Sequence, residues 1–285
     1  NIQIIHPNPA HRNSRKTLYA MFMKKILTTL FFALTTCMAI CDNLSKPILV
    51  LNQMGYYSRI NGAQIVVYDD QTVIYRKSKF EYYFVKLTAK EYSKLLLNIN
   101  TNFLSTQKND SSHIHTDSID YFIYDATWTT LTLWEGNRKI SVTKLGSIKS
   151  IGEGLHKSIN IEFKNIVKRL SSFKSIRAVK WIPDKVEINL WNNSYTGYKN
   201  FKIVDWNKEW PDTADINSKR WKNYSEPYYS IYLPKVFWPE FEKFWKKKIL
   251  NKSKLIYLFR MNGLIWQPSF RFPLPNENFW RNDMQ

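Results

Sequence analysis

Apolar and polar residues alternate along several short segments of the chain and recur at helical spacing in others. Within residues 63–77, two runs rich in Val, Ile and Tyr flank a polar turn at residues 69–71, which predicts a β-hairpin. A further apolar stretch at residues 82–87 precedes Thr88 and Glu91, which have the spacing of a capping box at the start of a helix. Apolar residues at helical spacing follow. The first elements are therefore expected in the order hairpin, strand, helix.

A similar order recurs farther along the chain. Apolar stretches at residues 121–134 and 139–143 flank a Gly136-Asn137 turn, and residues 159–173 then carry apolar side chains at helical spacing. A ββα-type unit is therefore expected twice. The two segments have dissimilar sequences, so the alternative to a duplicated unit is two independent segments of the same order.

The last third of the chain predicts further strands, a helix and a second clear hairpin. Pro239 suits the first turn of a helix, and Asn262-Gly263 is a two-residue hairpin signal. The expected elements are strands at 186–191, 201–206 and 229–233, a helix from Pro239, and a hairpin over 255–267.

Two segments of this last third show no steady period. Residues 207–227 are rich in Trp, Pro, Asp and Asn, which predicts an ordered surface loop. Residues from Pro268 onward contain three prolines, and we expect them to run extended across the surface.

These patterns predict an α+β fold with antiparallel sheets built from ββα-type units and with three main helices. The expected organisation is an upstream translated or disordered segment at 1–20, a signal peptide at 21–41, an α+β domain with the two ββα-like units at 42–175, and a second α+β subdomain with the Trp-rich loop and the last hairpin at 176–285.

The segment from Met21 to Cys41 has the layout of an export signal. Lys24 and Lys25 precede an apolar stretch over residues 26–39, and small residues follow. The stretch is too short for a transmembrane span, which needs roughly 20 apolar residues, and no other segment approaches that length. We expect an exported protein, periplasmic or extracellular, whose true start is Met21 or Met23. The alternative is that residues 1–20 are a long charged region of the same signal.

The only cysteines, Cys37 and Cys41, lie in or beside this signal. Cleavage after Cys41 would remove both, whereas cleavage after Ala39 would retain Cys41, and neither outcome allows a disulfide framework. Residues 34–37 also resemble a bacterial lipoprotein signal, with Thr36 where a smaller residue is usual. A lipid anchor at Cys37 is the alternative to simple cleavage.

The chain carries a formal net charge of +19. Five of its 42 Lys and Arg residues lie in residues 1–41, which hold no acidic residue, so the later residues keep 37 basic and 23 acidic groups. Such a balance attracts polyanions, which outside the cytoplasm means an acidic glycan, a lipid surface or an acidic partner protein. We expect no nucleic-acid partner, no cofactor and no transmembrane helix beyond the signal. The alternative is an ordinary lysine-rich solvated surface.

His113, His115 and Asp117 are candidate metal ligands. Alternate residues of an extended segment point to the same side, so two imidazoles and a carboxylate could face a zinc ion. The alternative is a polar loop before the strand expected near residue 121. No nucleophile or phosphate-loop motif accompanies these residues, so no catalytic residue is assigned.

The Trp-rich loop is the candidate ligand site. Trp206, Trp210 and Trp221 lie near the acidic residues Asp212 and Asp215, and flat apolar faces beside polar edges suit sugar rings. If two carboxylates of this loop faced each other, they could also supply acid and base chemistry for cleavage of a glycan. The alternative is that the tryptophans pack onto the sheet and the acids cap turns.

A succession of motifs resembles exported bacterial proteins of unassigned function. It comprises the hairpin at residues 66–74, the segment 87–92 and Thr116-Asp117 before a strand, with Gln71 where glycine is usual. The resemblance covers roughly residues 60–170 and implies no activity, cofactor or catalytic residue. We therefore expect a non-catalytic envelope interaction or inhibitor-like module. The alternative is a glycan-binding or glycan-cleaving envelope protein that uses the Trp-rich loop.

Overall fold

A computed structural model of the chain describes residues 46–55, 62–78, 81–97, 99–110, 113–115, 120–122, 127–149, 159–192, 201–221, 227–248 and 256–280. Residues 45–285 form one compact unit. The expected upstream segment, the signal peptide and Cys37 lie outside the described residues.

The first sheet contains seven strands in the order β8-β7-β1-β2-β3-β4-β9, and all neighbours pair antiparallel. Its first strand in the chain, β1, lies in the interior of the sheet and pairs with β2 on one side and with β7 on the other. The strands are β1 (Pro47–Gly55), β2 (Gly62–Tyr68), β3 (Thr72–Ser78), β4 (Glu81–Lys86), β7 (Thr127–Glu135), β8 (Arg138–Leu145) and β9 (Val179–Trp181). A separate two-stranded sheet joins β5 (His113–His115) to β6 (Asp120–Phe122).

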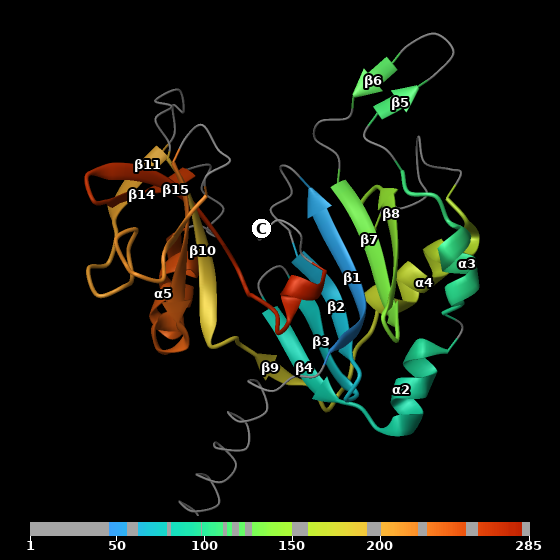
Figure 1. Cartoon of the computed structure of the whole chain (residues 1–285). Coiled ribbons are helices and arrows are strands. Elements are labelled where there is room, and N and C mark those ends of the chain that lie inside the picture. Colours follow the sequence, from blue (N-terminus) through green and yellow to red (C-terminus); the bar gives the residue numbers. More distant parts are fainter. Residues whose placement is uncertain are drawn as a thin grey trace, which may run out of the picture. The chain divides into compact units, whose positions relative to one another are not determined.

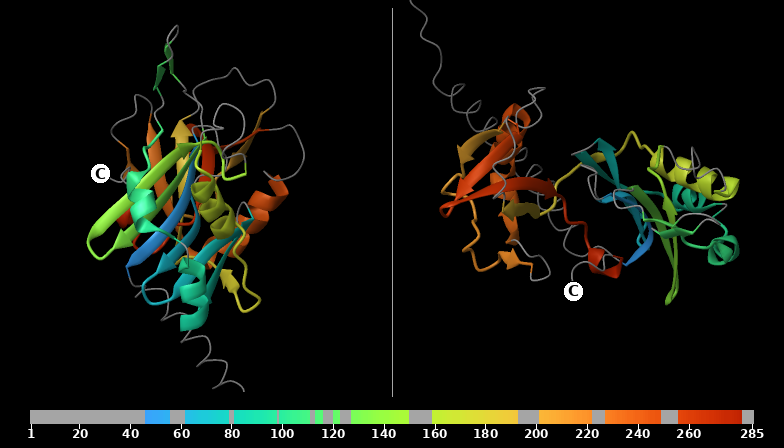
Figure 2. Two further views of the ribbon diagram at one scale, coloured as in Figure 1. Left: turned by 90° about the vertical axis from the view of Figure 1, so that its right-hand side faces the viewer. Right: turned by 90° about the horizontal axis from the view of Figure 1, so that it is seen from above.

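Helices α2 (Ala89–Leu96), α3 (Thr101–Thr106) and α4 (Ile161–Ser171) cover one face of the first sheet (Figures 1 and 2). Side chains of alternate strand residues point to this face, and the helices bury an apolar stripe against them. Phe163 and Leu170 of α4 are 0% and 1% exposed, and they join one core with Leu51, Val67 and Leu131 of the strands. The sheet is therefore held mainly by apolar burial under three helices.

Local sequence signals explain where these elements begin. Thr88 accepts a hydrogen bond from the Glu91 amide, and the Glu91 carboxylate accepts one from the Thr88 amide at 2.8 Å, so the predicted capping box is confirmed. Gln71 in the turn between β2 and β3 has a φ of 73°, in the left-handed region that favours glycine.

The second sheet contains six strands in the order β11-β14-β15-β10-β13-β12. Its neighbours pair antiparallel except β11 and β14, which are parallel. The strands are β10 (Lys185–Asn192), β11 (Phe201–Asp205), β12 (Lys219–Arg220), β13 (Tyr228–Pro234), β14 (Ile256–Met261) and β15 (Leu264–Arg271).

One face of the second sheet packs against α5 (Trp238–Lys248), which follows the short helix η2 (Lys235–Phe237). Phe270 of β15 contacts three rings of this helix, with centroid separations of 5.4 Å to Trp238, 5.7 Å to Phe241 and 4.8 Å to Trp245. Such edge-to-face contacts add to the burial of large apolar surfaces. An aromatic core therefore joins α5 to the sheet.

The segment after β15 departs from the expectation of an extended surface tail. Pro268 belongs to β15 and lies opposite Leu190, and the following Phe272 and Leu274 are 5% and 6% exposed. Tyr68 of β2 donates a hydrogen bond to the carbonyl of Pro275 at 3.0 Å, just before the short helix η3 (Glu277–Phe279). The prediction was wrong because the apolar side chains of Phe272 and Leu274, beside the prolines, are buried in the protein.

The α+β class with antiparallel sheets is confirmed, but the ββα units are not. The strands of both expected units belong to a single sheet, with β1 inserted between β2 and β7. The division into two domains stays a prediction. No helix among the described residues is both long and apolar enough to cross a membrane.

Candidate functional site

Two of the three predicted ligand-binding tryptophans lie in the aromatic core. Trp206 and Trp210 are 6% and 5% exposed, and their rings contact Phe259 at 5.0 Å and Phe241 at 5.3 Å between centroids. The indole nitrogen of Trp206 donates to the Pro211 carbonyl at 3.1 Å. Their ring faces are therefore occupied by protein, as in the alternative in which the tryptophans pack onto the sheet.

The predicted acidic residues of the same loop organise turns. Asp212 accepts a hydrogen bond from the Ala214 amide at 2.7 Å and another from the Asn262 side chain at 3.2 Å. Asp215 accepts one from the Asn217 amide at 2.8 Å. Short acidic side chains commonly bond to the backbone two residues on in this way. Both carboxylates therefore have a structural partner within their own loop.

The predicted metal ligands fall partly outside the described residues. His113 and His115 are the ends of β5, opposite Phe122 and Asp120 of β6, while Asp117 lies outside the described residues. In the described part of the chain, no group of three or more His, Cys, Asp or Glu residues is placed to hold a metal ion.

Trp221, the third predicted tryptophan, belongs to a stack of three aromatic rings, which we call the aromatic stack. Trp191 of β10 lies directly opposite Tyr228 of β13, and their rings are 5.1 Å apart at an interplanar angle of 20°. On its other side Tyr228 stacks with Trp221 at 5.7 Å and 29°. Lys219 places its Nζ 4.2 Å from the centre of the Trp221 ring, within the range of a cation–π contact.

The aromatic stack reaches the surface at one end. Trp191 is 40% exposed, whereas Tyr228 and Trp221 are partly buried. A tryptophan that is both stacked and exposed presents a flat apolar surface with a fixed orientation. The stack can therefore act as a preformed contact surface.

Buried hydrogen bonds tie the inner end of the stack to the sheet. The Trp221 indole nitrogen donates to Ser230 Oγ at 2.9 Å, and Ser230 lies 2.7 Å from Glu187 Oε1 and 2.9 Å from Asn189 Oδ1. A hydroxyl carries one hydrogen, so it donates to one of these two oxygens at a time. Ser230 and Glu187 are 0% exposed, which makes each of these bonds costly to lose.

Glu187 is in turn part of a buried ionic cluster. Its carboxylate pairs with Arg271, whose guanidinium also binds Glu277 through two hydrogen bonds of 2.7 and 2.8 Å. Burial lowers the pKa of Arg271, but the hydrogen bonds and charge of Glu277 and the charge of Glu187 outweigh it and raise that pKa. The guanidinium therefore stays charged, and the cluster fixes Glu187 as the acceptor at the base of the network.

Sequence patterns predicted Trp221 but not its partners Trp191, Tyr228 and Lys219. The signal for Trp191 was the alternation in β10, where the apolar Val186, Ile188 and Leu190 are buried on one face and the intervening residues form the other face. The pairing of Trp191 with Tyr228 depends on strand register across 37 residues of sequence, which local patterns do not determine.

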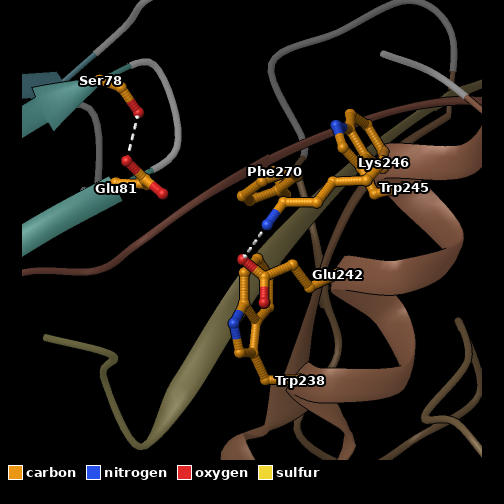
Figure 3. A pocket seen from close by; sticks show the side chains of 7 residues that line it. All are labelled: Ser78, Glu81, Trp238, Glu242, Trp245, Lys246 and Phe270. Carbon is orange, nitrogen blue, oxygen red and sulfur yellow. Dashed lines mark hydrogen bonds and ion pairs between the residues drawn. The ribbon is translucent and has the colours of Figure 1, made fainter. Parts of the chain in front are cut away.

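A small cavity lies beside α5 (Figure 3). Its volume is about 150 Å³, and rings of Trp238, Trp245 and Phe270 form much of its wall. Glu242 at its side pairs with Lys246 at 3.0 Å and with Lys180 at 3.1 Å. Burial raises the pKa of Glu242, but these two hydrogen bonds outweigh it and lower the pKa. The carboxylate at the cavity is therefore ionised, and its charge is already paired with two lysines of the protein.

Comparisons with protein-family models, with curated proteins and with solved structures found no match for this chain. Its function has to be argued from its own residues.

Proposed function

We propose that this chain is an exported, non-catalytic interaction protein that binds its partner through the aromatic stack. The observation that carries the proposal is Trp191, which is 40% exposed although one face of its ring is stacked on Tyr228. Binding energy at interfaces concentrates in a few residues, and Trp and Tyr are enriched among them. An exposed indole in a fixed orientation is such an anchor.

The surroundings of the stack support this proposal. Trp221 is held by its hydrogen bond to Ser230, and Ser230 is held by the buried carboxylate of Glu187. A binding surface whose side chains are already ordered loses less conformational entropy when a partner arrives. The stack therefore combines an apolar surface with a rigid support, as a binding site requires.

The test is affinity capture from an envelope extract with purified protein, at low and at moderate salt. We compare the unchanged protein with Trp191→Ala and with a matched control, Trp128→Ala, which removes a partly buried indole from β7 of the first sheet. Circular dichroism and thermal unfolding establish that all three proteins are folded.

A partner retained by the unchanged protein and the control at moderate salt, but released by Trp191→Ala, would support the proposal. Equal retention by the unchanged protein and by folded Trp191→Ala would refute it, because the stack would then make no contact with the partner.

Several predictions from the sequence remain proposals beside this one. They are export through residues 21–41, a lipid anchor at Cys37, the likeness to exported bacterial proteins over residues 60–170, and a repeated ββα unit. The alternative of a glycan-binding or glycan-cleaving protein also remains a proposal. Of the three tryptophans predicted for it, Trp206 and Trp210 are buried and Trp221 belongs to the aromatic stack.

A further inference from the structure

We infer that the aromatic stack binds an acidic polysaccharide, with a pyranose ring lying on the exposed face of Trp191. This inference rests on the proposed function and names the chemical class of the ligand. It joins three observations, which are the exposed indole, a polar neighbour on the next strand, and the positive charge of the chain.

The ring geometry suits a sugar. One face of Trp191 is covered by Tyr228 at 5.1 Å between ring centroids, and the residue as a whole is still 40% exposed. A pyranose has a face of C–H bonds and an edge of hydroxyl groups, so it can place its apolar face on an indole while its hydroxyls stay hydrogen-bonded. The same partial exposure offers little to a ligand that needs a deep pocket.

A hydrogen-bonding group stands beside the indole on the side away from Tyr228. Gln267 of β15 lies directly opposite Trp191 in the sheet register, so the two side chains project from the same face. Gln267 is exposed, and its amide can both donate and accept a hydrogen bond, as a sugar hydroxyl can. The pair therefore offers a sugar an apolar surface and a polar edge next to each other.

Charge favours an acidic ligand over a basic or neutral one. An exposed indole also attracts cations, but the residues after the signal carry 37 basic and 23 acidic groups, and this positive net charge repels cations. Lys219 lies at the other end of the stack from Trp191, with its Nζ 4.2 Å from the Trp221 ring, and adds to the positive field of the chain. A polymer of uronic acid satisfies both requirements, since each unit carries a pyranose ring and a carboxylate.

The experiment measures binding to three polymers by affinity electrophoresis at moderate salt. Polygalacturonate has pyranose rings and carboxylates, dextran has pyranose rings without charge, and poly-L-glutamate has carboxylates without rings. The proteins are the unchanged chain, Trp191→Ala, Gln267→Ala and the control Trp128→Ala. Because Gln267 is exposed, its substitution tests the site without removing part of the stack.

We expect polygalacturonate to bind at least ten-fold more tightly than either other polymer. Trp191→Ala should weaken that binding at least ten-fold, Gln267→Ala several-fold, and Trp128→Ala less than two-fold. If poly-L-glutamate binds as tightly as polygalacturonate, the inference is overturned, because charge alone would then explain the binding. If dextran binds as tightly as polygalacturonate, the conclusion that the ligand is acidic is overturned.

The outcomes separate this inference from the proposed function. If polygalacturonate does not bind but a captured protein is released by Trp191→Ala, the inference is refuted and the proposed interaction site is still supported. If Trp191→Ala changed neither polymer binding nor capture, both would fall.

Discussion

Ser230→Ala tests whether the buried network supports the aromatic stack. The substitution removes the hydroxyl that accepts from Trp221 and donates to Glu187 while leaving the carbon framework of the side chain almost unchanged. A hydrogen bond to a charged group contributes about 1.5–3 kcal/mol, and a buried donor left without a partner costs about 1–3 kcal/mol. Glu187 keeps its pairing with Arg271, and Trp221 is only partly buried. We therefore expect the free energy of unfolding to fall by about 3 kcal/mol.

Ser269→Ala is the matched control for this measurement. Ser230 and Ser269 lie on opposite sides of Asn189 in the sheet register, on the two neighbouring strands, and so project from the same face. Ser269 is partly buried, and its substitution should change the free energy of unfolding by less than about 0.5 kcal/mol. Urea denaturation followed by circular dichroism measures both variants. A loss below about 1 kcal/mol for Ser230→Ala, or equal losses for the two serines, would refute the supporting role of the network.

Three further predictions concern the core and the titration of single groups. Phe163→Ala, at a side chain that is 0% exposed beneath the first sheet, should lower the free energy of unfolding by about 3–5 kcal/mol in urea denaturation, and a loss below 1 kcal/mol would contradict the assigned core. Hydrogen bonds from Thr88 and then Arg177 lower the pKa of Glu91 from 4.5 to about 2, so its stabilisation is present above pH 4.5 and is lost as the pH falls toward 2. The thermal midpoint of Glu91→Gln should therefore lie below that of the unchanged protein at pH 6 and approach it near pH 2, and a constant difference would exclude this linkage. Burial raises the pKa of Tyr82 above its ordinary value of 10, so stability falls as the pH rises above 10, and Tyr82→Phe should flatten that alkaline decline in thermal unfolding.

Elements with a strong local signal were predictable from the sequence. The capping box at Thr88 and Glu91 marks the start of α2, and the turns at Gly136 and at Asn262-Gly263 join β7 to β8 and β14 to β15. Gly136, Asn262 and Gly263 all have positive φ values, of 60°, 51° and 76°. In each case the residues that determine the conformation are neighbours in the chain, so a short pattern contains the physical cause.

Elements that depend on distant partners were not predictable. β1, which has no strict alternation, becomes an interior strand only because β2 and β7 pair with its two edges. The parallel pairing of β11 with β14 joins residues about 55 positions apart. For the candidate site, composition identified the tryptophans, but it could not separate Trp221, which ends beside Tyr228, from Trp206, which enters the core. Burial is a property of the assembled sheet, so it cannot be predicted from local composition.

The ionic cluster at Glu187 links the aromatic stack to the segment that follows β15. Arg271 is the last residue of β15, and its second partner, Glu277, also accepts a hydrogen bond from the Leu274 amide. Burying two carboxylates and one guanidinium is expensive, and well-packed apolar residues could give equal stability, so stability alone does not explain the cluster. Its geometry gives an orientation that apolar packing would not give, because one guanidinium binds both Glu187 and Glu277. Glu187 accepts a hydrogen bond from Ser230, which binds Trp221. Glu277 accepts a hydrogen bond within the turn after β15. Removal of Glu277 should therefore disturb the stack as well as this turn, since Arg271 would keep a single carboxylate partner and the orientation of Glu187 would no longer be fixed from two sides.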